Sequence, residues 1–363
     1  MEPVLKKIDK YIIKKFIMTF FIALLLIIAI VIIFDISEKI GHFVENKAPL
    51  KAIVLDYYVN WVPYFMNMFS PLFVFITVIF FTSRMASDSE IIAILSCGVS
   101  YRRMMRPYII SAALIALLSL ALNLWVIPRS NVTRVKFETT YVKKKNPFGT
   151  NNVHYQIDPG KFVYVESFAS WNNTAYGFTL EDIKDNKLVS KLSAETAVWD
   201  STMGGWRLNK YFIRDYKEGL EDAVRTGDKL DTVISLTVTD FYRNKNTVET
   251  LPIEQLDNLI SQQKLRGDSN VMYALIEKHT RYALPFSAFI LTIMGVSLSS
   301  RKRRGGIGLN IGIGIALSFT YILFLRFSQM FVYSGAMTPA VALWLPNVIF
   351  GIIAAFLYSR ASK

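Results

Sequence analysis

The stretch Phe16-Ile-Met-Thr-Phe-Phe-Ile-Ala-Leu-Leu-Leu-Ile-Ile-Ala-Ile-Val-Ile-Ile-Phe34 contains nineteen residues and no charge. As a helix it would be about 28 Å long, close to the ~30 Å hydrocarbon thickness of a bilayer. Hydrocarbon cannot satisfy exposed backbone polar groups, so the segment must be helical. It is longer than the core of a secretory signal peptide, and no small-residue cleavage pattern follows it. The sequence therefore predicts an uncleaved first membrane span.

Five more uncharged runs follow, at residues 57–83, 107–128, 282–300, 305–325 and 327–359. Together they predict an α-helical membrane protein with six transmembrane helices in two groups of three. Helices 1–3 fall within residues 1–129, and helices 4–6 fall within residues 271–363. Residues 35–56, which are of mixed charge, are expected to form a loop between the first two spans.

The net charge of +13 suggests nucleic-acid binding until the charges are mapped. Residues 130–270 carry 19 basic and 19 acidic residues, so the excess of Lys and Arg lies at the ends of the spans. Short loops rich in Lys and Arg stay in the cytoplasm. We therefore expect both termini to be cytoplasmic, the 130–270 domain to lie on the opposite side of the membrane, and no nucleic-acid partner.

Residues 130–270 have the composition of a β-domain. Residues 153–157 and 161–168 are rich in β-branched and aromatic residues, and Asp158-Pro-Gly160 predicts the turn between them. Further strands are predicted near residues 176–180, 187–199, 206–215 and 232–239, followed by a helix over 252–264. Short strands at this spacing predict a sandwich or a jelly roll.

Residues 87–98, between spans 2 and 3, predict a short amphipathic helix. Asp88, Ser89 and Glu90 are suited to its positive N-terminal end, and Gly98 is suited to its C-terminal end. The apolar side chains Ile91, Ile92, Ile94 and Leu95 follow Glu90 and are expected on one side of the helix. The helix is too short to span a membrane, so it lies on the bilayer or docks on a partner. The only cysteine of the chain, Cys97, falls in this segment.

The motifs of several enzyme classes are missing from the sequence. It has no Walker A pattern, no His-Glu-x-x-His helix and no Gly-x-Ser-x-Gly elbow. The three histidines are far apart in sequence, which makes a metal site improbable. We therefore expect no catalytic site, no bound cofactor and no ATPase site in this chain, so that another protein must supply the energy for any work.

The order of three spans, a β-domain and three spans resembles the LptF/LptG permeases of the bacterial lipopolysaccharide exporter. Three local patterns carry the resemblance along nearly the whole chain. They are the segment from Ser89-Glu90 to Gly98-Val-Ser100, the β-stretch from Ala194-Glu-Thr-Ala-Val-Trp199 through Trp206-Arg-Leu to Tyr211, and Glu277-Lys-His-Thr-Arg-Tyr-Ala-Leu-Pro285 followed by Arg301-Lys-Arg-Arg-Gly-Gly306.

The resemblance implies a multi-pass protein of the bacterial inner membrane with a periplasmic, jelly-roll-like β-domain. It also implies partners: a cytoplasmic LptB-like ABC ATPase dimer that uses ATP, a second LptF/LptG-like permease subunit, and LptC/LptA-like periplasmic bridge proteins. The two permeases would extract lipopolysaccharide from the outer leaflet, among membrane lipids, and pass it to the β-bridge. The sequence does not distinguish an F-like from a G-like member, nor a homodimer from a heterodimer.

The same resemblance assigns site residues. Glu90 would pair with an arginine of the ATPase, and Ile91, Ile94, Leu95 and Gly98 would pack into its groove. The alternatives are a simple interaction of Glu90 with the helix dipole and contact of the apolar residues with the membrane surface. Lipopolysaccharide carries phosphates, so basic residues near the outer ends of spans are candidates for binding it: Lys39, Arg129, Arg134, Lys136 and Arg326. Arg326 interrupts an apolar span, where a charge is costly. The alternative for Arg326 is snorkelling to the interface.

Two other functions remain open at this point. One is a membrane-anchored envelope scaffold that binds other proteins through its β-domain, for which Glu90 and Arg326 would be dispensable. The other is an envelope enzyme with an unrecognised site in the β-domain.

Overall fold

A computed structural model describes residues 6–142, 150–169, 171–216, 223–241, 248–265, 270–301 and 306–361. The chain divides into two compact units, one formed by residues 1–142 and 275–363 and the other by residues 143–274. The β-unit therefore begins later than the boundary at residue 130 expected from the sequence, because residues 130–142 continue the helix of the third span.

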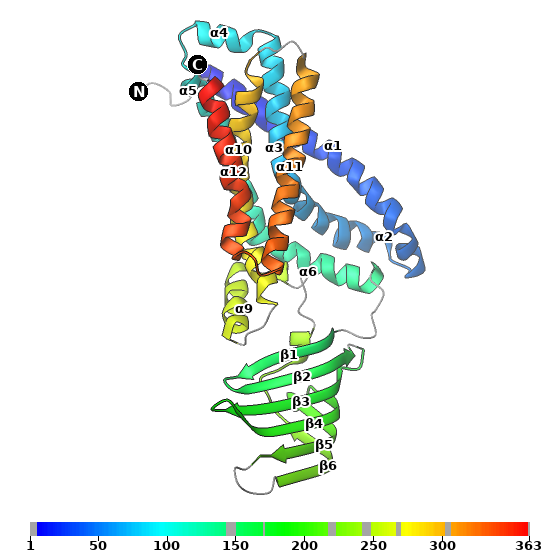
Figure 1. Cartoon of the computed structure of the whole chain (residues 1–363). Coiled ribbons are helices and arrows are strands. Elements are labelled where there is room, and N and C mark those ends of the chain that lie inside the picture. The colour runs from blue at the N-terminus through cyan, green and yellow to red at the C-terminus, as the bar shows by residue number, and fades with distance from the viewer. Residues whose placement is uncertain are drawn as a thin grey trace. The chain divides into compact units, whose positions relative to one another are not determined.

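Within the described residues, six helical segments are long and apolar enough to cross a membrane. They form the first unit, three before the β-unit and three after it, as predicted (Figure 1). The first is α1 (Lys7–Glu45). The second joins α2 (Leu50–Ala52) to α3 (Val59–Ser87), and the third joins α5 (Tyr101–Ala121) to α6 (Ile127–Phe137) and ends at Val142. The last three are α10 (Val271–Ser299), α11 (Gly306–Tyr333) and α12 (Pro339–Ala361).

The predicted loop over residues 35–56 is wrong. Helix α1 continues to Glu45, and helical structure resumes at Leu50, which leaves only a short connection between them. Two charges of this region are compatible with a helix because they pair along it. Lys39 lies one turn after Asp35, and its Nζ is 2.5 Å from the Asp35 carboxylate.

The packing of α1 follows from a stripe of apolar residues at every fourth position. Ile12, Phe16, Phe20, Leu24 and Ile28 are buried, whereas most of the other residues of the span are partly or fully exposed. Spacing of three or four residues places side chains on one face of a helix. This face packs against buried residues of α3 and α5, including Phe81 and Tyr108.

Hydrogen bonds of buried polar side chains also connect the spans. The Asn67 side chain of α3 donates to Asn123 Oδ1 at 2.7 Å and accepts from the Ser119 hydroxyl at 2.6 Å. Asn347 of α12 accepts from the Tyr321 hydroxyl of α11 at 2.9 Å and donates to the Ala283 carbonyl of α10 at 2.8 Å. Such bonds fix the register of helices whose apolar surfaces alone would slide.

The second unit contains a six-stranded antiparallel sheet in sequential order. Its strands are β1 (Thr150–Asp158), β2 (Lys161–Ala169), β3 (Thr174–Lys184), β4 (Lys187–Asp200), β5 (Gly205–Asp215) and β6 (Ala223–Thr232). The sheet curls as it is crossed from β1 to β6, as fits a jelly-roll-like domain (Figure 1). The predicted turn between β1 and β2 is confirmed. Its Gly160 has a φ of 80°, and a Cβ there would lie 2.4 Å from the Ile183 carbonyl oxygen, so only glycine fits.

The strand predicted over residues 232–239 is wrong. The sixth strand ends at Thr232, and residues Val238–Phe241 form the short helix α7. The intervening segment closes the core instead: Leu236 is fully buried, and its carbonyl accepts a 2.8 Å bond from Trp206 Nε1. The predicted helix after the sheet is confirmed as α9 (Ile253–Leu265).

Candidate functional site

The short helix predicted after span 2 is present as α4 (Glu90–Ser96), which joins α3 to α5 at the end of the helices near the C-terminus (Figure 1). Backbone turns with positive φ bound it, at Ser89 (61°) and Gly98 (80°). Gly98 lies beyond the last helical residue, as predicted, with its N–H 3.0 Å from the Leu95 carbonyl. Ser89 was expected to cap the helix, but its side chain makes no capping bond.

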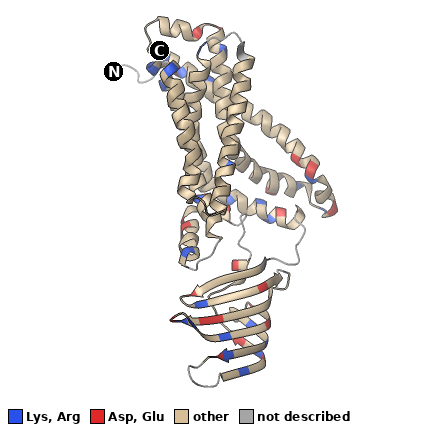
Figure 2. Cartoon of the chain, in the orientation of Figure 1, with Lys and Arg blue, Asp and Glu red and all other residues tan. Residues whose placement is uncertain are grey.

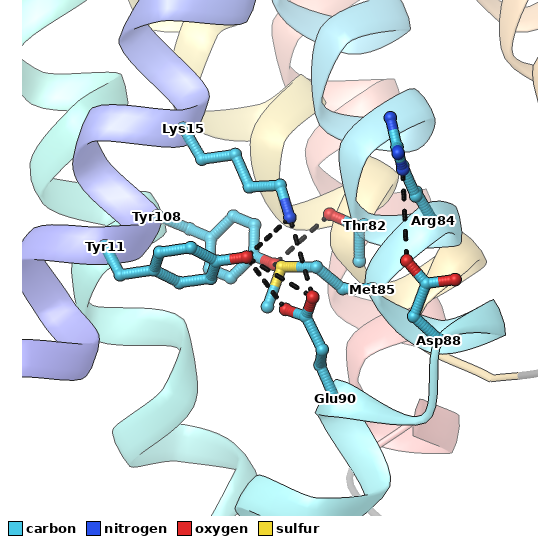
Figure 3. Close-up of polar contacts among 8 residues, drawn as sticks. All are labelled: Tyr11, Lys15, Thr82, Arg84, Met85, Asp88, Glu90 and Tyr108. Atoms are coloured by element: carbon cyan, nitrogen blue, oxygen red, sulfur yellow. Dashed lines mark hydrogen bonds and ion pairs between the residues drawn. The ribbon is translucent and has the colours of Figure 1, made fainter.

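Glu90 is tied to helix α1. Its carboxylate accepts hydrogen bonds of 3.1 and 3.3 Å from the Tyr11 hydroxyl, and Lys15 Nζ lies 3.8 Å away (Figure 3). Lys15 also donates to the Tyr11 hydroxyl at 2.7 Å, so the three groups form one chain of contacts. The Glu90 side chain remains 34% exposed. A carboxylate has about four acceptor positions, so Glu90 can still accept from a partner.

The two faces of α4 differ. Ile91 is buried in the core of the membrane unit, and Ile94 packs against the same core. Ile92 and Leu95 point outward, with 54% and 37% of their surfaces exposed. Ile91 therefore has no surface to offer to a partner, which corrects its sequence-based assignment, and Ile92, which that assignment omitted, takes its place on the exposed face. Cys97, next along the chain, is also exposed.

A second interaction, an ion pair, connects the start of α1 to the start of α5. Arg103 donates to both carboxylate oxygens of Asp9, at 2.7 and 2.6 Å, and Asp9 is almost fully buried. Asp9 also accepts from the Lys6 N–H at 2.9 Å. Two-pronged pairs of this kind are geometrically specific. Helix α1 is thus held at one end by residues from both α4 and α5.

Two of the five basic residues proposed to contact lipid already have interaction partners within the protein. Lys39 pairs with Asp35, donates to the Tyr57 hydroxyl, and lies 4.8 Å from the centre of the Tyr57 ring. Arg134 is buried, lies 4.6 Å from the centre of the Tyr64 ring, and is 3.8 Å from the Glu138 carboxylate. Much of the charge of these two residues is therefore already balanced.

The other three basic residues are exposed. Arg129 and Lys136 lie seven positions apart on α6, hence on one side of it, and their side chains form no ion pair with any described residue. Arg326 donates to Gln329 Oε1 at 3.4 Å and lies 3.1 Å from Met68 Sδ on α3, both uncharged groups. Arg129, Lys136 and Arg326 therefore keep charge available for an anion.

One comparison with known proteins decides the family. The sequence profile of the lipopolysaccharide export system permease LptF/LptG matches residues 10–360, nearly the whole chain. The chain belongs to this family. None of the curated proteins matches the sequence. The chain is thus a permease, a membrane subunit for lipopolysaccharide export. Members of this family are permease subunits and are not themselves ATPases.

Across the described residues, no group of three or more His, Cys, Asp or Glu side chains is placed to hold a metal ion. The polar residues of the α4 region connect helices to one another. Of these contacts, sequence reasoning identified Glu90 but missed Tyr11, Lys15, Asp9 and Arg103. Clustered charge at the starts of the first and third spans could have suggested Asp9, Lys15 and Arg103, whereas no sequence signal pointed to Tyr11.

Proposed function

We propose that the permease works in an ATP-driven exporter that extracts lipopolysaccharide from the outer leaflet of the inner membrane and passes it to a periplasmic β-bridge. An LptB-like ATPase dimer binds and hydrolyses the ATP and docks on α4. A second LptF/LptG-like subunit completes the transport path, and LptC/LptA-like proteins continue the bridge from the β-unit. Both termini lie in the cytoplasm in this arrangement, as the placement of Lys and Arg supports.

The contact of Glu90 with Tyr11 and Lys15 carries the proposal. It joins a short exposed helix to the first long span, so that a push on α4 is transmitted to α1. Ile91 anchors α4 in the core, while Ile92 and Leu95 are left for a partner. A partner arginine would share the Glu90 carboxylate with Lys15, and closing of the ATPase would shift this shared contact.

The exposed cations support an anionic cargo. Arg326 lies within an apolar helix, and among the described residues no carboxylate lies beside it, which makes this a costly place for a charge unless a ligand uses it. Arg129 and Lys136 add two more uncompensated charges on α6. We assign these three residues to the phosphates of lipopolysaccharide, and we assign Lys39 and Arg134 to holding helices near them.

The test compares two neighbouring acids in the reconstituted exporter. Glu90→Gln removes the charge that joins α4 to α1, whereas Asp88→Asn removes an exposed acid that lies 3.9 Å from Arg84. We expect Glu90→Gln to lower ATP-driven lipopolysaccharide release about tenfold, the effect of losing one charged hydrogen bond. Asp88→Asn should leave release near the wild-type rate. Co-purification with the ATPase reports docking separately.

Equal release by both variants would contradict the role of Glu90. The cargo assignment has its own test, in which a photo-crosslinking amino acid replaces Arg326 and lipopolysaccharide adducts are detected in living cells. Adducts that accumulate when the ATPase is inactive are expected. Absence of adducts, together with normal release by Arg326→Ala, would favour the envelope scaffold instead.

A further inference from the structure

A groove of about 660 Å³ lies between α5, α10 and α12, and Glu90, Tyr11 and Lys15 are not among the residues that line it. Its walls are mainly apolar and include Ile109 and Ile110 of α5, Ile293 of α10, and Gly351 and Ala355 of α12. This volume is within the range of sites that hold a small ligand. None of the described residues that line it is acidic.

Arg102 and Arg106 of α5 line one part of this groove. They are one helical turn apart, so their side chains lie side by side. Both are exposed, and neither forms an ion pair or hydrogen bond with any residue that the structure describes. Two like charges at this spacing repel each other. An anion between them would relieve the repulsion.

Along α5 the arginines come first and the apolar residues of the groove follow, which matches the order of headgroup and acyl chain in a lipid molecule. Arg102 and Arg106 belong to the first turns of α5, at the helix ends near the C-terminus where Lys and Arg gather (Figure 2). Ile109 and Ile110 follow along the same helix, further into the span. Basic pockets between transmembrane helices on the cytoplasmic side bind anionic lipid headgroups.

We infer that this groove binds an anionic glycerophospholipid of the cytoplasmic leaflet. Arg102 and Arg106 hold its phosphate, and one acyl chain runs along Ile109, Ile293 and Gly351. A free phosphate would satisfy the arginines but would leave the apolar walls unused, so the lipid fits the groove better. The site is separate from the residues proposed to contact lipopolysaccharide, and its test does not require transport.

Glycine at position 351 allows the chain-binding part to be tested without disturbing the fold. A Cβ at Gly351 would meet no atom within 4 Å, so a larger side chain has space there. Gly351→Leu therefore fills the groove and leaves the arginines in place. Gly312→Leu on α11 is the matched control, because a Cβ there also meets nothing within 4 Å and Gly312 does not line the groove.

The experiment is native mass spectrometry of the full-length permease in detergent, titrated with dioleoylphosphatidylglycerol. We expect one tightly bound lipid. Replacing both arginines, Arg102→Gln with Arg106→Gln, should weaken binding roughly 30-fold, whereas Arg84→Gln, an exposed arginine outside the groove, should not. Gly351→Leu should weaken it about tenfold, and Gly312→Leu should not. Thermal melting of each variant verifies folding.

Three results would overturn the inference. Dioleoylphosphatidylcholine could bind as tightly as the anionic lipid, which would remove the role of charge. The double arginine variant could bind like the wild type. Inorganic phosphate could compete at equal concentration while Gly351→Leu has no effect, which would make the arginines a site for a free anion and not for a lipid.

Discussion

Arg103 at the start of α5 donates two hydrogen bonds, of 2.7 and 2.6 Å, to the Asp9 carboxylate at the start of α1. The two partners differ in their contact with water: the Asp9 side chain is 2% exposed and that of Arg103 is 26% exposed. A charge left alone in a buried position costs more than one that can reach water. The pair should therefore respond unequally to the loss of either partner.

We expect Arg103→Gln to lower the free energy of unfolding by about 2–3 kcal/mol, because it removes the cation that is paired with the buried Asp9 carboxylate. Asp9→Asn should cost less, because water can solvate the remaining arginine. Denaturant unfolding in mild detergent measures both. Arg84→Gln is the control, since its pair with Asp88 is 3.9 Å long and exposed, and it should cost less than about 1 kcal/mol. Equal losses for Arg103→Gln and Arg84→Gln would contradict the assignment.

Tyr11 should determine how firmly α4 is held. Tyr11→Phe removes the hydroxyl that donates to Glu90 and accepts from Lys15. We expect backbone amides of α4 to exchange with deuterium roughly fivefold faster, the effect of about 1 kcal/mol of lost local stability. Hydrogen exchange with mass spectrometry measures this directly. Lys14→Gln serves as control, because Lys14 is exposed on α1 and makes no contact with Glu90. Unchanged exchange in α4 would show that other contacts hold it.

Trp206 should dominate the stability of the β-unit. It is fully buried, stacks edge-on against Phe168 and Phe241, and donates to the Leu236 carbonyl. Trp206→Ala should cost about 3–5 kcal/mol through the cavity left behind. Trp171→Ala removes the same side chain from a site that is 69% exposed, and should change stability by less than about 0.5 kcal/mol. Limited proteolysis of the β-unit in the full chain compares them, and similar cleavage rates would refute the ranking.

The elements that could be predicted from the sequence are those whose structure is determined by local chemistry. Long uncharged runs identified all six spans, and β-branched runs around Asp158-Pro-Gly160 identified the first hairpin. The predicted loop over residues 35–56 failed because the charges of Asp35 and Lys39 suggest exposure, whereas in the structure these two side chains pair with each other along α1 and are largely buried. The strand predicted over residues 232–239 failed because its apolar residues fill a core that the other strands create. Leu236 closes that core.

The site was predicted in part for a similar reason. The acidic start and the glycine at the end of α4 are local signals, so Glu90 and Gly98 could be identified. The orientation of α4 could not, because Ile91, Ile92, Ile94 and Leu95 leave apolar residues on more than one side of two helical turns. The partners Tyr11 and Lys15 are more than 70 residues away from Glu90, and only tertiary packing brings them together.

Cys97 is exposed at the end of α4, and it is the only cysteine in the chain. A maleimide fluorophore or nitroxide spin label would therefore attach to the native protein at one position, two residues after Leu95. No background cysteines need to be removed first. Spectroscopy on this single label can follow the engagement and release of a partner in real time, in the wild-type sequence.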